Sequence, residues 1–335
     1  MSTKKTVFIV CGLLLLAALI VACGPSQPGP AGPAGPAGPV GPKGEPGTVP
    51  SAADLACTAC HNDTNLLTSK AAEWSTSLHG TGTAFIAEGL EDGCAGCHSG
   101  SGFSAMLTAG LTPDKSVADP NTTPQDCRAC HQIHTTYTTD DYALRTTAPL
   151  AMYATSTTFD GGAGNLCANC HQARRVIAAA VEGKIAVTIR FGPHHGPQSD
   201  MLLGVGGAGA VTGTPSMHYS TVENTCVTCH MGDSANHTFS PNVATCTACH
   251  ADATSFDING VQTTVTGKLD ALKAALTTAG LLDAQGAIVA GSYPEAQANA
   301  LWNYIYVNNE DKSLGVHNSK YTNALLDASL AVFGK

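Results

Sequence analysis

Aromatic and charged side chains are both scarce in this sequence. Of its 335 residues, 5% are aromatic and 12% are charged. Aromatic side chains bury the most apolar surface per residue, so their scarcity leaves the chain poorly supplied for an ordinary core built from side chains alone. The composition therefore predicts that something other than side chains fills part of the interior.

An excess of basic residues is missing as well. The 16 Lys and Arg residues face 25 Asp and Glu residues, and the formal net charge of −9 becomes −11 if Lys4 and Lys5 are removed with an export signal. Nucleic-acid binding relies on basic side chains that neutralise phosphates, so nucleic acid is excluded as a partner. The negative balance favours basic or cationic partners instead.

Cysteine, by contrast, is abundant and regularly placed. The pattern Cys-x-x-Cys-His occurs six times, and we number these motifs one to six in chain order. Only Cys11 and Cys23 fall outside the motifs, and Cys11 lies in the predicted export signal, so no pair is left over in the mature chain for a structural disulfide. The motif cysteines are Cys57, Cys60, Cys94, Cys97, Cys127, Cys130, Cys167, Cys170, Cys226, Cys229, Cys246 and Cys249.

Each motif suits the covalent attachment of a haem. Its two thiols can add to the haem vinyl groups while the adjacent histidine is directed at the iron. A single copy would also fit a zinc half-site or a thioredoxin-like redox pair. Six zinc half-sites would leave six regularly placed histidines unused, whereas six haems use every motif residue. The pattern predicts six covalently attached haem c groups with these proximal ligands: His61, His98, His131, His171, His230 and His250.

With these motifs the chain resembles the multihaem c-type cytochromes, especially the exported ones of metal-reducing bacteria. The motifs lie between Cys57 and His250, which leaves roughly 32 residues of chain for each haem. The resemblance implies a mainly α fold with extensive coil, little or no β-sheet, and a core packed with haem. It also implies a place in the cell envelope.

Other histidines are candidates for the second axial position on the irons. An isolated histidine is more often a surface residue, but six irons each take a second ligand and seven imidazoles remain. His134 lies three residues after His131, close to one helical turn, so it would serve a neighbouring haem and not its own. The seven candidates are His79, His134, His194, His195, His218, His237 and His317.

The resemblance extends to several of these histidines. The segment "EWSTSLHG" around His79 resembles the one that supplies a distal histidine in the nitrite reductase, hydroxylamine oxidoreductase and octahaem reductase relatives. His218 and His237 flank motif five, a layout that recurs in the family, and the "GVHN" segment resembles one that supplies an axial ligand there through the equivalent of His317. Of the adjacent pair, His194 and His195, one ligand is expected, and the sequence does not choose between them.

The N-terminus predicts export and anchoring. Lys4 and Lys5 precede an apolar run that is shorter than a comfortable membrane span, so residues 1–22 are interpreted as a signal peptide. The ending "IVAC" before Gly24 resembles the bacterial lipoprotein signal, which implies a lipidated Cys23 and, by the Gram-negative sorting pattern, the outer membrane on its periplasmic or extracellular face. A transmembrane anchor is the alternative.

A collagen-like stretch follows, "GPAGPAGPAGPVGPKGEPG", with glycine at every third position. Six such triplets are few for a stable triple helix, so residues 23–50 are interpreted as a lipidated N-terminus and a stiff stalk. Oligomer formation through the stalk is the alternative. Residues 51–256 then form the predicted hexahaem domain.

Residues 257–335 are predicted to be a helical segment that packs on the haem domain. Leu269, Leu272, Leu276 and Ala279 recur at helical spacing, and two further helical patterns follow. The run "KIAVTIRFG" predicts a short strand and hence only a small sheet. "GVGGAG" has the spacing of a dinucleotide fingerprint but no surrounding βαβ unit, so we interpret it as a loop.

These features together favour an electron-transfer protein. Six haems with two histidines each would pass electrons between other redox proteins, such as cytochromes, and a periplasmic or extracellular acceptor. An alternative is a reductase of the nitrite, hydroxylamine or tetrathionate kind with one open haem. Another is the subunit of a cytochrome filament in which a distal histidine crosses between copies.

Overall fold

The computed structural model describes residues 60–61, 65–194 and 196–335. Contacts divide the chain into two units, Met1–Val49 and Pro50–Lys335, and every described residue belongs to the second. The predicted signal peptide, the lipidated Cys23, the collagen-like stalk, Cys57 and His195 lie outside the described residues. Those predictions stay predictions.

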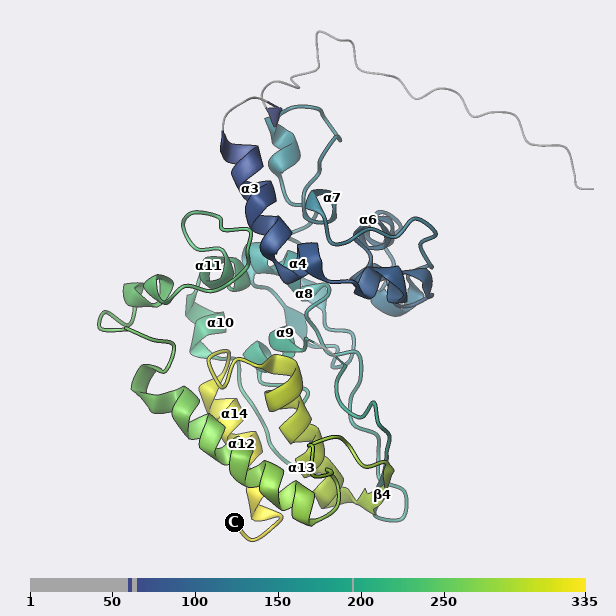
Figure 1. The fold of residues 1–335 in the computed structure, drawn as a ribbon, viewed down its shortest axis with the longest axis vertical. Helices are drawn as coiled ribbons and strands as arrows, with labels where there is room; N and C mark the ends of the chain where they lie inside the picture. Colours follow the sequence, from purple (N-terminus) through teal and green to yellow (C-terminus); the bar gives the residue numbers. More distant parts are fainter. Residues whose placement is uncertain (1–59, 62–64, 195) are drawn as a thin grey trace, which may run out of the picture. The chain divides into compact units, whose positions relative to one another are not determined.

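Up to residue 260 the described chain is mostly coil interrupted by short helices (Figure 1). The α-helices of this part are α3 (Asn65–Thr76), α4 (Leu78–Thr81), α5 (Ala95–His98), α6 (Gly100–Thr108), α7 (Cys127–Cys130), α8 (Asn165–Ala168), α9 (Gln198–Leu203), α10 (Met217–Thr221) and α11 (Cys226–His230). The 3₁₀ turns are η1 (Ala84–Ile86), η2 (Glu88–Leu90), η3 (Pro113–Lys115), η4 (Thr139–Tyr142), η5 (Gly162–Gly164), η6 (Val243–Ala248) and η7 (Ile258–Gly260).

The Cys-x-x-Cys-His motifs coincide with several of these short helices. Motifs two to five lie on or begin within α5, α7, α8 and α11, and motif six overlaps the 3₁₀ turn η6. One helical turn places two residues that are three positions apart on the same side, so both thiols of a motif face the same way. Side-chain caps start such short helices: Asp126 accepts from the Arg128 amide at α7, and Asn242 accepts from the Ala244 amide at η6.

Three longer helices follow, as the sequence predicts: α12 (Val261–Thr278), α13 (Glu295–Ile305) and α14 (Ser319–Ala331). They contact one another pairwise (Figure 1). In α12, Leu269, Leu272 and Leu276 are buried and Ala279, just past its end, is half-buried. The Asn318 side chain caps α14 by accepting from the amide of Tyr321.

A π-helical turn, η8 (Tyr306–Asp311), continues α13. It ends at Lys312, whose φ of 61° is left-handed. Such turns are rare and occur often at functional sites, because the extra residue redirects the side chains that follow. Here the turn carries Asp311, which is 3% exposed, into the interior at its last position.

The described chain contains two small antiparallel sheets. Strands β1 (Leu150–Ala151) and β2 (Thr158–Phe159) form one, and β3 (Lys184–Val187) and β4 (Gly291–Pro294) form the other. In the second sheet Ile185 pairs with Tyr293. The predicted strand in "KIAVTIRFG" is therefore confirmed, and its partner lies more than a hundred residues downstream.

The largest apolar core is built around the C-terminal helices. It joins α12, α13 and α14 to residues from 185 to 208, so the segment after residue 256 shares its core with the segment before it. The loop of residues 204–209 packs on α13 and η8 through polar contacts: Trp302 of α13 donates to the Gly206 carbonyl (3.0 Å), and Tyr306 of η8 donates to the Val205 carbonyl (2.8 Å). The segment is a loop in the structure, as predicted.

Two smaller apolar clusters support the region of the motifs. One surrounds Met152, Phe159 and Leu203, and the other surrounds Phe103 and Met106. The described structure is thus mostly helix and coil with very little sheet, which confirms the predicted fold class.

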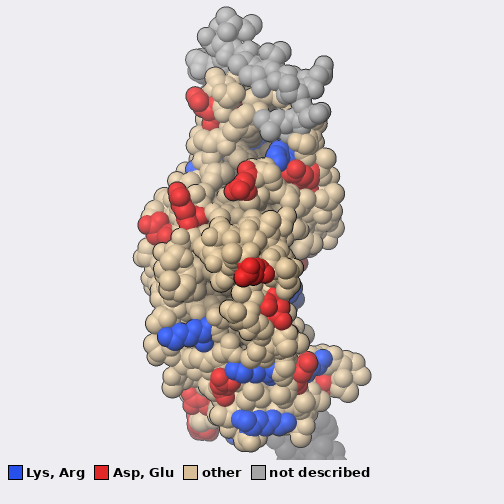
Figure 2. All heavy atoms as spheres, turned by 90° about the vertical axis from the view of Figure 1, so that its left-hand side faces the viewer, with Lys and Arg blue, Asp and Glu red and all other residues tan. Residues whose placement is uncertain are grey.

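Charged side chains are scattered over the surface seen in Figure 2. Acidic side chains are spread over that face, and several Lys and Arg side chains interleave with them in its lower part. Within the part of the chain that the structure describes, no helix has the length and apolar character needed to cross a membrane.

Candidate haem-binding site

Every proximal histidine of the six motifs faces another histidine. The centroids of the paired rings are 6.1 to 6.3 Å apart. All six partners belong to the seven predicted distal candidates; the seventh, His195, lies outside the described residues. In motif order the pairs are His61 with His134, His98 with His194, His131 with His237, His171 with His79, His230 with His317 and His250 with His218.

The spacing of these pairs fits a single metal ion between two imidazoles. A metal–nitrogen bond of about 2.0–2.1 Å on each side, with roughly 1.1 Å from each nitrogen to its ring centroid, sets the centroids about 6.2–6.4 Å apart. A direct hydrogen bond of about 2.9 Å between the two rings would bring the centroids to roughly 5 Å. The observed distances of 6.1 to 6.3 Å lie within about 0.1 Å of the first arrangement and about 1 Å from the second, so the residues present fit bis-histidine haem iron.

Hydrogen bonds at Nδ1 orient several of these rings. His131, His230, His218 and His237 each face a backbone carbonyl through Nδ1, at 2.6 to 2.9 Å. A carbonyl can only accept, so Nδ1 carries the proton and Nε2 keeps a lone pair that can bind a metal. This fixed tautomer is the one that metal-binding histidines use.

Two further rings use side-chain acceptors at Nδ1. His171 donates to Gln198 Oε1 (3.1 Å), while the other end of that amide donates to the Glu310 carbonyl (3.0 Å). His317 donates to Asp311 Oδ1 (2.6 Å). Helix α9 thereby holds the histidine of motif four, and the π-turn η8 holds the histidine that faces motif five.

Burial keeps several of these imidazoles neutral. It lowers the pKa of His79 to about 4, with a smaller contribution from the neighbouring His171. Burial also lowers the pKa of His131 and that of His230. A neutral imidazole is the form that binds a metal, so these side chains are ready ligands at neutral pH.

His317 behaves differently. Burial by itself would lower its pKa, but the charge and the hydrogen bond of Asp311 outweigh burial and raise the pKa. The His317 side chain is 19% exposed and the Asp311 side chain is fully covered. The two residues form a buried imidazole–carboxylate pair behind motif five.

Thiols of different motifs touch one another. Cys97 of motif two and Cys170 of motif four share a hydrogen bond, which lowers the pKa of Cys97. Cys167 of motif four and Cys226 of motif five share another, which lowers the pKa of Cys226 and raises that of Cys167. None of the described cysteines forms a disulfide. Motif four is therefore in direct contact with motifs two and five.

The remaining motifs are linked less directly. Burial raises the pKa of Cys229, and the nearby Cys246 thiol adds to the rise. Motif six therefore lies close to motif five. A hydrogen bond between the Tyr142 hydroxyl and Cys60 raises the pKa of Tyr142, and the Tyr142 carbonyl accepts from His131, so one residue joins motifs one and three.

Phe239 stands between three histidines. Its ring centroid is 4.8 Å from that of His79 and 5.8 Å from that of His237, while its carbonyl accepts from His230. The ligand candidates of motifs three and four therefore meet at the Phe239 ring, and that of motif five binds the backbone of the same residue.

The structure corrects one detail of the sequence interpretation. His134 does not continue the helix of motif three, because α7 ends at Cys130 and His131 is extended. His134 has a left-handed φ of 63°, and His194 one of 71°. This backbone conformation costs energy for residues other than glycine, and it turns each ring toward a motif other than the nearest in sequence. His134 thus faces His61, not His131.

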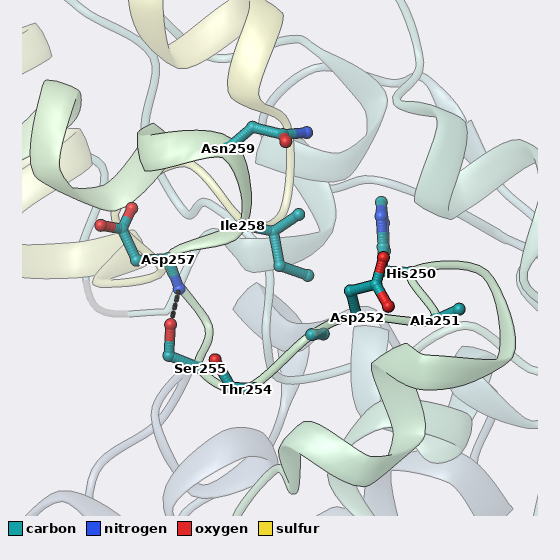
Figure 3. A pocket seen from close by; sticks show the side chains of 9 residues that line it. His250, Ala251, Asp252, Thr254, Ser255, Asp257, Ile258 and Asn259 are labelled. Atoms are coloured by element: carbon teal, nitrogen blue, oxygen red, sulfur yellow. Dashed lines mark hydrogen bonds between the residues drawn. The ribbon is translucent and has the colours of Figure 1, made fainter.

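A cavity of about 320 Å³ lies beside motif six. It is lined by His250, by residues of the loop that leads into η7, among them Asp252, and by Ile258 at the start of η7 (Figure 3). The amide of Asp257 donates to Ser255 Oγ (3.3 Å) in its wall. In the described residues no group of three or more His, Cys, Asp or Glu side chains is arranged to hold a bare metal ion.

Several residues of the site were not foreseen from the sequence. Four Nδ1 acceptors are backbone carbonyls, which leave no residue-type signal. Gln198, Asp311 and Phe239 belong to no sequence motif, and only the fold places each of them next to a histidine. Only Asp311, an acid six residues before a predicted ligand, offered a sequence signal.

Comparisons with known proteins agree with this fold. No protein-family model matches the chain, and no curated protein matches it. The crystal structure of outer cell wall cytochrome OcwA is similar at a TM-score of 0.50 and 23% sequence identity. The match covers 79% of this chain and 50% of that chain, so the chain spans about half the length of that cytochrome. The likeness shows that the chain shares a cytochrome fold.

Proposed function

We propose that the chain binds six haem c groups and acts as an electron-transfer protein of the cell envelope. The observation that carries the proposal is the set of six facing histidine pairs, each with the spacing of two imidazoles on one metal ion. The motif thiols would hold each haem covalently, and the paired histidines would be its axial ligands. Bound haem iron would supply reversible one-electron chemistry.

The contacts between motifs support a continuous route. Motif four touches motifs two and five through thiols, motif five lies next to motif six, and Tyr142 joins motifs one and three. Phe239 connects the histidines of motif three to those of motif four. These links describe a row with motif two as a side branch at motif four.

The same pairs weigh against the two alternatives. A reductase needs an axial position open to substrate, whereas every proximal histidine faces a second imidazole. A filament that borrows a distal histidine from the next subunit needs a vacancy within the chain, whereas all six partners come from this chain. Electron transfer is therefore the better supported function.

The proposed location is the envelope, with Cys23 as a lipid anchor in the outer membrane. The export and lipoprotein signals of the sequence support it, and the similar structure is that of a cytochrome named for the outer cell wall. The proposed partners are other redox proteins or an extracellular acceptor. The excess of acidic residues suits basic or cationic ones.

Carbon monoxide tests this proposal directly, because it binds ferrous haem readily where an axial position is open. We expect the intact mass of the purified holoprotein to correspond to six haems, and the reduced protein to give no carbon monoxide difference band. A band equivalent to one haem would contradict the electron-transfer proposal and favour a reductase. A mass with fewer haems would contradict the hexahaem assignment.

A further inference from the structure

Among the six paired histidines whose Nδ1 hydrogen bond the structure shows, one differs from the others in the acceptor behind its ring. Six histidines of the described pairs have an Nδ1 hydrogen bond resolved, and five of them donate to an uncharged oxygen: four backbone carbonyls and the Gln198 amide. His317 donates instead to the carboxylate of Asp311, at 2.6 Å. The contrast lies in the charge of the acceptor, because the donor atom is the same.

Asp311 is built into its position. It ends the π-turn η8, and its side chain is fully covered. While Oδ1 accepts from His317, Oδ2 accepts from the hydroxyl of Ser313 (2.5 Å) and from its amide (3.3 Å). The Ser313 hydroxyl in turn accepts from the His317 amide (3.2 Å). Both carboxylate oxygens are thus occupied by donors, and the aspartate cannot turn away from the ring.

A carboxylate behind a metal-binding histidine changes what the histidine gives to the metal. The acceptor draws the Nδ1 proton toward itself, which makes Nε2 a stronger electron donor. A stronger donor stabilises ferric over ferrous iron, so hydrogen bonding behind the ligand is one of the means by which a protein sets a haem potential. An uncharged acceptor has the same effect to a smaller degree.

We propose that Asp311 is a positioning residue that acts through His317 to lower the reduction potential of the haem on motif five below the value that an uncharged acceptor would give. The proposal rests on the proposed function, because it takes His317 and His230 as the axial ligands of that haem. Motif five lies between motifs four and six, so Asp311 would make an interior member of the row the harder one to reduce.

The test is a spectroscopic redox titration of the holoprotein in three forms. Asp311→Asn keeps the shape and an acceptor oxygen but removes the charge, and we expect one of six potentials to rise while five stay in place. Ser313→Ala removes a donor from the carboxylate, leaves more of its charge on His317, and should lower the same potential. Asp327→Asn is the matched control, since Asp327 is 60% exposed and pairs with Lys268, and it should shift none.

Electron paramagnetic resonance adds a second readout. In Asp311→Asn the low-spin ferric signal of one haem should change, and the signals of the other five haems should stay the same. Six low-spin haems with potentials unmoved by both variants would overturn the role of Asp311 and leave the proposed function intact. Should Asp311→Asn lose haem, the Ser313→Ala titration decides alone, and an unshifted potential overturns the proposal. A carbon monoxide band in the unsubstituted protein would overturn the proposed function instead.

Discussion

At the scale of single residues, the two ring nitrogens of histidine have different roles. Each of these paired imidazoles faces another ring, and in six of the described histidines Nδ1 is held by an oxygen. The acceptor fixes the tautomer, the ring direction and the donor strength together. The properties of each of these histidines as a ligand therefore depend on the residue behind it as well as on the one it faces.

His79→Met tests a distal histidine without removing a haem. Its ring faces His171 of motif four, whose thiols are unaffected, so six haems should remain attached. A thioether donates less than an imidazole and stabilises ferrous iron, so one potential should rise on the order of 0.1 V, within the roughly 0.8 V that axial ligands span. Redox titration measures it.

The control for this variant is His195→Met, at the histidine left over by the six pairs. It should leave all six potentials unchanged. If all six potentials are unchanged in His79→Met, His79 is not an axial ligand. If a potential shifts in His195→Met, the axial ligand from the adjacent pair is not His194 alone.

At the scale of elements, helix α9 ties motif four to the helical core. Gln198 holds His171, and the amide of Ser199 donates to the His171 carbonyl (3.1 Å). Asp200 accepts from the amide of Ala173 (2.7 Å), while Met201 lies in the largest apolar core. The short helix α9 thus contacts both motif four and the largest apolar core.

This arrangement predicts a pH dependence of stability. Asp200 is fully buried, and burial raises its pKa to about 6. The folded state then holds a proton that the unfolded state has released, so stability falls as pH rises from about 4 to about 6. The loss is about 3 kcal/mol by pH 7. Asp200→Asn keeps the acceptor and cannot ionise, so it should escape this loss.

Denaturant unfolding of both proteins at pH 4.5 and pH 7 measures the difference. The free energy of unfolding of the unsubstituted protein should fall relative to that of the variant as pH rises. A parallel pH profile for the two proteins would show that Asp200 does not change its protonation in this range.

At the scale of the whole molecule, the histidine pairs join segments that are far apart in sequence. His79 meets His171, and His230 meets His317. The large apolar core lies with the C-terminal helices, whereas the region of the motifs has only small clusters. This distribution agrees with the shortage of aromatic residues and with the expectation that bound haem fills the interior around the motifs.

Cys23→Ala tests how the whole molecule is held. Without the thiol no lipid can be attached, so the protein should move from the membrane fraction to the soluble fraction while its haem content stays the same. Fractionation after a high-salt wash, followed by haem staining, measures this. Protein that remained in the washed membranes would rule out the lipoprotein anchor, and Cys11→Ala should have no effect because Cys11 lies in the predicted signal.

The sequence by itself determined the attachment motifs, the count of candidate ligands and the C-terminal helices. These are local patterns: a motif spans five residues, and the apolar stripe of α12 repeats within one helix. The mainly helical fold class followed from the same patterns and from the resemblance they carry. The partner of β3 did not, since strand pairing across a hundred residues leaves no local trace.

Only the tertiary structure decided which histidine faces which. His134 faces His61 because a left-handed backbone turns it away from motif three, and His194 reaches His98 in the same way. The difference between Asp311 and a backbone carbonyl as acceptor also arises in space, through a π-turn that no pattern announced. Ligand pairing is a matter of distance between remote segments, and the chain defines those distances only after its helices have packed.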